Sequence, residues 1–465
     1  MNDNQNKKID KLIITAQLSK EQGNWSSTVN FLNEILKIDP NNQKALNNIG
    51  NVHKETKNFD KAIKYYLKAI NSNPKYKIAK INLAILYHDL GNLKEAKKIY
   101  KELIILDKYN FAIHFNLSRI DFSYFDKSMI NFIENSMHHE SINDYSKASG
   151  YFILAKNQQI KKNFDKEISF LEKGHEYFIK SITKKIYEQN YNHWLNIIPK
   201  KFDKIEITNL HENKKPDLKI NPIFIIGMPR SGSTLIESII SSGKLKIPNG
   251  GETATINWAL SKNYRKDLLN DNLDKIIIDK DKIINDILGK YKNLNLLNKN
   301  NKLFFTDKSL ENFFFIDIIL ELFPNTKFIH CKRNKVDNIF AIYQNFLTKM
   351  SRTHSLEDII KYFDNYLNVM TIFNKRFKEK IFSIILEDLT LNSKKIYQDV
   401  FKFCNLEWSE NSLEYHKRKD LFSTTASNIQ IREKIYKYNN EKYEVYKKHI
   451  KKFEQKYNWL KKDLL

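Results

Sequence analysis

The sequence predicts a protein of two parts, an array of paired helices followed by an α/β domain built on a parallel sheet. Three observations support this fold class. The sequence repeats between about residues 17 and 119, strand-like apolar runs alternate with helical patterns after residue 221, and a turn rich in Gly and Ser follows the first run. Alternating strands and helices are typical of parallel sheets. We expect a helical domain at 1–199, a linker at 200–220 and the α/β domain at 221–465.

The composition predicts a folded protein, and its positive charge does not by itself indicate binding to nucleic acid. A chain of 465 residues is longer than one hydrophobic core usually supports, so more than one domain is expected. A composition of 41% hydrophobic and 28% charged residues is ordinary for a soluble fold. The formal net charge of +24 invites a nucleic-acid interpretation, but Lys is abundant along the whole chain and no basic face stands out. We therefore favour diffuse charge, whose field would still help to gather an anionic cofactor.

Targeting and metal signals are lacking in the sequence. No run approaches the ~18 apolar residues of a membrane span, and the first residues have no apolar stretch like that of a secretory signal. With only Cys331 and Cys404, a disulfide framework is not expected, and a reducing compartment is the default. No His and Cys spacing indicates a metal site. We expect a cytoplasmic protein without a metal or a transmembrane segment.

The repeat in the first part has a period of 34 residues. Gly23-Asn24-Trp25, Lys57-Asn58-Phe59 and Gly91-Asn92-Leu93 lie 34 apart (57 − 23 and 91 − 57), as do Pro40 and Pro74. Pro ends one helix pair because it cannot continue a helix. The period and the residue types resemble the tetratricopeptide repeat. Such arrays do no chemistry, so we expect either a scaffold or a surface that binds a peptide or protein.

Beyond residue 119 the repeat becomes degenerate. Residues 162–165 echo 57–60, so we expect helices to continue to about residue 185. The stretch 200–220 is polar and lacks periodicity, which is typical of a linker.

The stretch 221–242 has the order strand, small-residue turn, helix. Apolar residues 223–226 predict a buried strand, and the next residues follow the spacing of a P-loop, Gly227-x-x-x-x-Gly232-Ser233-Thr234. Backbone N–H groups at such a helix start can hold an anion. A nucleoside triphosphatase has Lys where this chain has Ser233, so the usual γ-phosphate clamp is missing. The cation within the turn is Arg230.

Three further strands are expected at 302–306, 326–331 and 381–386, each followed by polar residues. The first two end in Asp307-Lys308 and Lys332-Arg333. Because the carboxyl ends of parallel strands meet at one edge of a sheet, these residues should lie near the P-loop-like turn. Guanidinium groups suit bidentate contacts with phosphate. The sequence therefore predicts an anion site at this edge.

The stretches PIFIIGMPRSGSTL, GGET, FTDK, FPNTKFIHCKR and ILEDL together resemble the sulfotransferase family. The resemblance runs from residue 221 onward and is greatest to bacterial tetratricopeptide-repeat sulfotransferases and the related tyrosylprotein sulfotransferases. It implies 3′-phosphoadenylyl sulfate (PAPS) as the donor of a sulfuryl group to an acceptor hydroxyl or amine. It also explains the missing Lys, because PAPS has no γ-phosphate.

The resemblance implies a set of donor-binding residues. The element expected to hold the 5′-phosphosulfate consists of Arg230, Ser231, Gly232, Ser233 and Thr234. Arg333 matches the residue that binds the 3′-phosphate, and Ser427 and Lys442 fall near further cofactor contacts. The chain departs from the family where a Ser contact is replaced by Ala341 and an Asp-Pro pair by Asn334-Lys335. Affinity for the 3′-phosphate should then be weaker or be recovered by Lys332 or Lys335.

The resemblance also implies three catalytic residues. Glu252 matches the proposed base of the tyrosylprotein branch, and Lys308 matches a Lys that contacts the sulfuryl group and the leaving oxygen. Arg230 would share in stabilising their charge. Each has a structural alternative, since Glu252 could stabilise a helix start and Lys308 could pair with Asp307 or Glu311. His330 lies within a strand and is expected to be a packed residue.

Two alternatives to a sulfotransferase remain open at this point. Ser233 argues against a P-loop kinase or nucleoside triphosphatase, and the change at Ala341 leaves room for a tetratricopeptide scaffold with a degenerate catalytic domain. The acceptor pocket is expected in the variable stretches 267–301 and 348–364, which carry no readable motif. A protein tyrosine, a sugar hydroxyl and a small molecule all stay open as acceptors.

Overall fold

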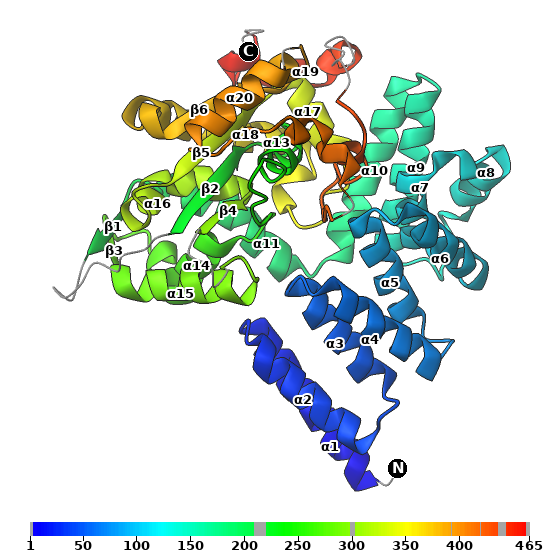
Figure 1. The fold of residues 1–465 in the computed structure, drawn as a ribbon. Helices are drawn as coiled ribbons and strands as arrows, with labels where there is room; N and C mark the ends of the chain where they lie inside the picture. The colour runs from blue at the N-terminus through cyan, green and yellow to red at the C-terminus, as the bar shows by residue number, and fades with distance from the viewer. Residues whose placement is uncertain are drawn as a thin grey trace. The chain divides into compact units, whose positions relative to one another are not determined.

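The computed structural model describes residues 3–208, 220–297, 303–391, 393–418, 420–435 and 443–461. The chain forms two compact units, of which the first contains residues 1–126 with 289–297. The second contains residues 127–288 with 298–465. Figure 1 shows the ribbon of both units.

The first unit is an array of helices joined by tight turns (Figure 1). Its helices are α1 (Asp3–Glu21), α2 (Trp25–Ile38), α3 (Gln43–Glu55), α4 (Phe59–Ser72), α5 (Lys77–Leu90), α6 (Leu93–Leu106) and α7 (Phe111–Ile120). The predicted repeat is confirmed by its turns, because Gly23, Lys57 and Gly91 all have a positive φ, of 73°, 59° and 82°. The repeated position is therefore a left-handed residue between the two helices of a pair.

Small residues set the spacing of these helix pairs. The four Ala residues at equivalent positions are at most 1% exposed: Ala45, Ala62, Ala79 and Ala96. A Cβ added to Gly50 of α3 would lie 2.6 Å from the ring of Tyr66 on α4, so only Gly fits there. The sequence keeps small side chains where helices approach closely, and this closeness specifies the pairing.

The second unit is built on a four-stranded parallel sheet in the order β4-β2-β5-β6 (Figure 1). The strands are β2 (Ile220–Gly227), β4 (Leu303–Asp307), β5 (Lys327–Lys332) and β6 (Ile381–Ile385). All four strands predicted from the sequence are confirmed, with bounds shifted by at most a few residues. The register pairs Phe224 with Asp307 and Gly227 with Cys331, which brings the carboxyl ends of β4 and β5 to the turn after β2.

Helices cover both faces of this sheet. The helices that follow β2 in this unit are α13 (Ser233–Ile240), α14 (Thr255–Leu269), α16 (Ile316–Leu322), α17 (Lys335–Tyr343), α18 (Leu356–Arg376), α19 (Leu386–Leu391), α20 (Ser393–Phe403) and the first residues of α15 (Lys280–Asn293). On one face Ile225 and Ile329 pack with apolar residues of α13 and α20. On the other, Phe224 and Phe328 stack with ring centroids 5.5 Å apart, as the alternation of side chains along a strand requires.

A second, two-stranded parallel sheet was not predicted. Its strands are β1 (Ile205–Thr208) and β3 (Ile276–Asp279). The first lies in the expected linker 200–220, and the second lies in a stretch expected to be helical. Segments of four residues are too short to be told from helix segments by periodicity. Residues 209–219 of the expected linker lie outside the described residues.

The helices from residue 127 to 201 belong to the same compact unit as the sheet. They are α8 (Lys127–Ser136), α9 (Asp144–Ile160), α10 (Phe164–Ser181), α11 (Lys184–Asn192), a π-helical turn (His193–Ile197) and α12 (Ile198–Lys201). The predicted boundary at residue 199 therefore does not coincide with the division between the compact units. Among the described residues, no helix is both long enough and apolar enough to cross a membrane.

Buried polar contacts join α10 to the α/β domain. The Glu167 carboxylate accepts hydrogen bonds from Tyr446 Oη (2.6 Å) and Gln344 Nε2 (2.9 Å). His175 Nε2 lies 2.9 Å from Tyr343 O, and His175 Nδ1 lies 2.9 Å from His354 Nδ1. His175 thus donates to the carbonyl and accepts from His354, an arrangement that needs the His175 ring to be neutral.

This histidine pair predicts that the second unit loses stability in acid. Burial lowers the pKa of His175 to about 4, and burial together with His175 lowers the pKa of His354 well below its usual value. In the unfolded chain these rings titrate near ~6.5, so the unfolded state binds more protons as pH falls from there towards about 4. We expect the free energy of unfolding to drop by about 2 kcal/mol from His175 alone between about pH 7.5 and 5.

Urea unfolding followed by tryptophan fluorescence measures this effect, because four of the five tryptophans, at 194, 258, 408 and 459, lie in the second unit. The double variant His175→Gln with His354→Gln should show a weaker pH dependence than the wild type. His138→Gln, an exposed histidine in the same unit, is the control. An unchanged pH dependence in the double variant would contradict the assignment.

Candidate functional site

The turn after β2 is bent by three residues with positive φ. These are Gly227 (φ 140°), Arg230 (φ 66°) and Gly232 (φ 89°). A Cβ on Gly227 would lie 2.3 Å from the carbonyl oxygen of Cys331, so the pairing of β2 with β5 requires Gly here. Arg230 holds a left-handed conformation that side chains other than Gly adopt at a cost, which is a frequent property of binding turns.

The turn leads directly into α13. Gly232 occupies the N-cap position, and within the described part of the chain no side chain caps this helix. The first-turn N–H groups have no partner within the helix, and they carry the positive end of the helix dipole. The hydroxyl of Ser231 donates to the Met228 carbonyl (2.7 Å) and so stabilises the turn itself. The element can hold an anion through backbone N–H groups.

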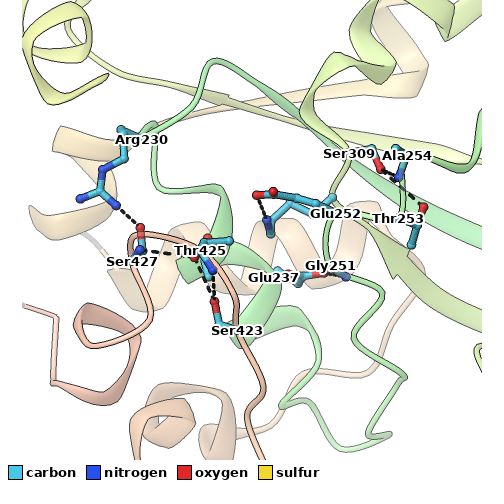
Figure 2. Close-up of polar contacts among 12 residues, drawn as sticks. Arg230, Glu237, Gly251, Glu252, Thr253, Ala254, Ser309, Ser423, Thr425 and Ser427 are labelled. Atoms are coloured by element: carbon cyan, nitrogen blue, oxygen red, sulfur yellow. Dashed lines mark hydrogen bonds and ion pairs between the residues drawn. The ribbon is translucent and has the colours of Figure 1, made fainter. Parts of the chain in front are cut away.

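A segment near the C-terminus lies beside this turn (Figure 2). Arg230 Nη1 donates to Ser427 Oγ (2.5 Å), and Nη2 donates to Gln430 Oε1 (3.1 Å). The hydroxyls of Thr234 and Thr425 are 3.2 Å apart. The structure therefore brings Ser427 to the predicted loop, whereas Lys442 lies outside the described residues.

Arg333 extends the cationic site from the end of β5. Its Nη1 donates to the carbonyl oxygen of Arg230 at 3.0 Å, and its guanidinium lies 5.4 Å from the centre of the Tyr443 ring. The structure thus brings together two arginines that the sequence placed after two different strands, Arg230 after β2 and Arg333 after β5. Ala341 is buried on α17, where Asn338 contacts the loop instead and donates to the Pro229 carbonyl at 2.6 Å. The contact made by Asn338 was not predicted.

Glu252 and Lys308 form an ion pair at the end of β4. Lys308 Nζ lies 2.9 Å from Glu252 Oε1. The Lys308 side chain is 1% exposed and that of Glu252 is 36% exposed. Neither Asp307 nor Glu311, the alternative partners considered for Lys308, takes this place. The pair joins two residues expected to be catalytic.

The charges around the pair keep both groups ionised. Burial acts to lower the pKa of Lys308, but attraction to Glu252, Glu237 and Glu311 outweighs it and raises this pKa. Burial acts to raise the pKa of Glu252, yet Lys308, with smaller contributions from Lys349 and Arg352, holds that pKa below its usual value. At neutral pH the site therefore presents a carboxylate and an ammonium group in contact.

A polar frame holds the segment from which Glu252 projects (Figure 2). Asp307 Oδ2 accepts from Thr253 Oγ1 (2.7 Å), and Ser309 Oγ accepts from the N–H of Ala254 (2.7 Å). Asp307 Oδ1 accepts from the N–H of Ser309 (2.9 Å). The sequence showed Asp307 next to Lys308 but gave no sign of this role.

Two other buried polar residues are structural. His330 is buried in β5, with Nε2 2.5 Å from Tyr366 Oη and Nδ1 3.2 Å from Ser383 Oγ, which confirms that it is a packed residue. Arg352 lies in the expected acceptor stretch 348–364, but it is buried, paired with Glu311 and stacked 4.3 Å from the centre of the Tyr362 ring. It acts on Glu252 through its charge.

Comparison with known families gives matches in both parts of the chain. Residues 222–410 match the model of the sulfotransferase family, and residues 44–76 and 79–110 match tetratricopeptide repeat models.

Individual relatives are distant or partial. An uncharacterized protein of Aquifex aeolicus is 27% identical over 373 residues, which cover 78% of this chain but 47% of that protein. The human protein O-mannosyl-transferase TMTC3 is 33% identical over 94 residues, 20% of this chain and 10% of its own length. The chain thus spans less than half of either relative.

Solved structures include the sulfotransferase domain of the Synechococcus PCC 7002 olefin synthase, with 17% identity, coverage of 48% of this chain and 88% of that one, and a TM-score of 0.33. Sulfotransferase STF1 from Mycobacterium tuberculosis has 11% identity, coverage of 65% and 97%, and a TM-score of 0.29. The family matches, taken with the parallel sheet and its P-loop-like turn, identify residues 222–410 as a sulfotransferase-family domain that follows tetratricopeptide repeats at residues 44–76 and 79–110.

Proposed function

We propose that this protein transfers the sulfuryl group of PAPS to an acceptor hydroxyl. One observation carries the proposal: two groups of residues lie at the same edge of one parallel sheet. The first is the turn after β2, which lacks the P-loop Lys and in which Arg230 contacts Arg333, and the second is the Glu252–Lys308 ion pair. An anion-binding turn next to a carboxylate and a buried ammonium group suits transfer of an anionic group to a hydroxyl that must lose its proton.

The residues present fit the donor in charge and in hydrogen-bonding groups. The first-turn N–H groups of α13, with the hydroxyls of Ser233 and Thr234, would hold the 5′-phosphosulfate. Arg333 would bind the 3′-phosphate, for which its planar guanidinium is suited. Arg230 lies between these places, since its own carbonyl accepts from Arg333 and its side chain reaches Ser427. Ser427 and Lys442 would add cofactor contacts.

The proposed reaction needs one proton acceptor and a set of positive charges. Glu252 accepts the proton of the acceptor hydroxyl while the hydroxyl oxygen forms its bond to sulfur. The bond between sulfur and the bridging phosphate oxygen breaks, and its electron pair stays on adenosine 3′,5′-bisphosphate. Lys308, Arg230 and the N–H groups of α13 stabilise the charge on the sulfuryl and bridging oxygens. Side chains supply the cations, so the proposal includes no metal.

The ion pair gives Lys308 and Glu252 linked roles. Without the donor, Lys308 is held by Glu252 at 2.9 Å. A negative charge that develops on the bridging oxygen would compete for the same ammonium group. As Lys308 turns towards that oxygen, Glu252 loses its main stabilising charge and becomes a stronger base. Removal of the proton and departure of the leaving group would thus promote each other.

Transfer of radiolabelled sulfate from PAPS tests the proposal. The full chain is incubated with PAPS and a panel of acceptors that includes a tyrosine peptide, a sugar and a small phenol. Label should appear in at least one acceptor. Magnesium-dependent ATP hydrolysis without transfer would favour a nucleoside triphosphatase, and failure to bind adenosine 3′,5′-bisphosphate would favour a degenerate scaffold.

Arg333→Met should weaken binding of adenosine 3′,5′-bisphosphate by about 100-fold, since it removes a charged partner from a partly buried phosphate site. Affinity for 5′-AMP, which lacks the 3′-phosphate, should change by less than about threefold. Titration calorimetry with both nucleotides measures the difference. Arg376→Met, an exposed residue at the end of α18, is the matched control. Equal losses for both nucleotides would show that Arg333 does not read the 3′-phosphate.

The proposal also covers the acceptor and the way in which the protein binds it. The tetratricopeptide repeats would bind a peptide or protein, which favours a protein side chain such as tyrosine as acceptor. A cytoplasmic location would fit the two buried free thiols, Cys331 and Cys404.

A further inference from the structure

Glu237 is a buried acidic residue close to the proposed catalytic pair. It lies on α13 and is 2% exposed. Its Oε1 accepts two hydrogen bonds, from the N–H of Gly251 and from Thr306 Oγ1, both at 2.8 Å (Figure 2 shows the first). Thr306 Oγ1 in turn accepts from the N–H of Gly250 at 3.0 Å. One carboxylate thereby anchors both glycines that precede Glu252.

The two glycines let the backbone pass close to β4. A Cβ on Gly250 would lie 1.8 Å from the Thr306 carbonyl oxygen, so the turn runs directly against β4. Gly251 has φ 67°, a conformation that Gly adopts without strain, and its carbonyl accepts from the N–H of Lys308 at 2.9 Å. A small rotation at Gly251 would carry the Glu252 carboxylate away from Lys308.

Glu237 also acts on Lys308 through its charge. The carboxylates that attract this ammonium group are Glu252, Glu237 and Glu311, and burial alone would lower its pKa. On the other side of the sheet edge, the buried Cys331 thiol also interacts with Lys308. Since Glu252 must release Lys308 during transfer, the charge of Glu237 would keep Lys308 protonated at that moment.

We propose that Glu237 is a positioning residue, which fixes the Gly250–Gly251 turn so that Glu252 meets Lys308 and which holds the charge on Lys308 while that pair opens. This inference rests on the proposed function. It assigns a task to a helix residue that touches neither the donor nor the acceptor.

Two variants separate the two effects of Glu237. Glu237→Gln keeps an oxygen that can accept from Gly251 but removes the charge. Glu237→Ala removes both, and because it could impair folding, circular dichroism first compares each variant with the wild type. The matched control is Glu407→Gln, which removes a carboxylate from an exposed ion pair with Lys244.

Three readouts follow in the full-length protein. Hydrogen exchange of the peptide spanning 248–254 should accelerate at least about tenfold in Glu237→Ala, because the Gly251 amide loses its buried acceptor and the Thr306 hydroxyl that accepts from Gly250 loses its anchor. Competitive acetylation of Lys308 should show a lower pKa in Glu237→Gln. In both variants kcat should fall by about 10- to 100-fold while KM for PAPS stays within about threefold, and the alkaline limb of the rate profile should move to lower pH.

Each outcome decides the inference. If exchange, Lys308 labelling and the pH profile all match those of Glu407→Gln, Glu237 has no positioning role. Faster exchange with unchanged kcat and pH profile would reduce Glu237 to a structural residue and overturn the proposal. If the wild type transfers no sulfate, exchange and labelling still report on the turn and on Lys308. Failure of the proposed function is thus distinguishable from failure of this inference.

Discussion

Glu252→Gln is expected to lower kcat by about 10²- to 10⁴-fold, the range for loss of a general base. Gln has nearly the same size, and its amide oxygen can still accept from Lys308, so the ion-pair geometry at 2.9 Å is preserved as a hydrogen bond. Only the capacity to take a proton is lost. Glu252→Ala should lose turnover as well, with additional disturbance of Lys308.

Binding measurements separate a chemical role from a binding role. Glu252 lies in the segment just before α14 rather than in the loop that would hold the phosphates, so calorimetry should find affinity for adenosine 3′,5′-bisphosphate within about threefold of wild type. The control is Asp388→Asn, which changes an acidic residue at the start of α19. If Glu252→Gln keeps the full rate with every acceptor, the base assignment is wrong.

Lys308→Met is expected to lower kcat by about 10²- to 10³-fold, the loss typical of one preorganised donor to a developing anion. Met fills a similar volume without the charge, which suits a side chain that is 1% exposed. Arg should not rescue the rate, because a guanidinium is larger than the buried space of an ammonium group.

Loss of Lys308 also changes the charge state of Glu252. Lys308 is the main influence that lowers the Glu252 pKa against burial, so in Lys308→Met this pKa should rise above its usual value. A raised pKa means that the carboxylate is protonated at higher pH, and the acid limb of the residual activity should move upward. Lys244→Met, from the exposed pair with Glu407, is the control. An unmoved acid limb would show that the two residues act independently.

The fold was largely predictable because its signals are local. The strand at 223–226 is a continuous apolar run, the strand at 381–386 is apolar apart from Ser383, and the helix pairs are marked by a turn residue with positive φ such as Lys57. β1 and β3 were missed because segments of four residues are too short to show a period. The assignment of α8–α12 to the sheet depends on contacts such as His175 with His354, which lie far apart in the sequence.

The candidate site was predictable only where motifs mark it. Arg230, Arg333, Glu252 and Lys308 follow strands or sit in short conspicuous stretches, and the structure brings each pair together. Glu237 resembles any polar residue on a helix, and its burial arises only when α13 packs beside β4. Polar residues of this kind acquire their role from tertiary structure, which periodicity does not encode.

Calorimetric titration of the full-length chain with adenosine 3′,5′-bisphosphate, 5′-AMP and ATP with magnesium tests the donor assignment most directly. The structure places no Lys at position 233 and two joined arginines beside the turn. We therefore predict that the 3′,5′-bisphosphate binds at least about tenfold more tightly than 5′-AMP and than ATP, since a charged phosphate contact contributes about 1.5–3 kcal/mol. Equal affinity for the bisphosphate and 5′-AMP, tighter binding of ATP, or no binding of the bisphosphate would contradict it.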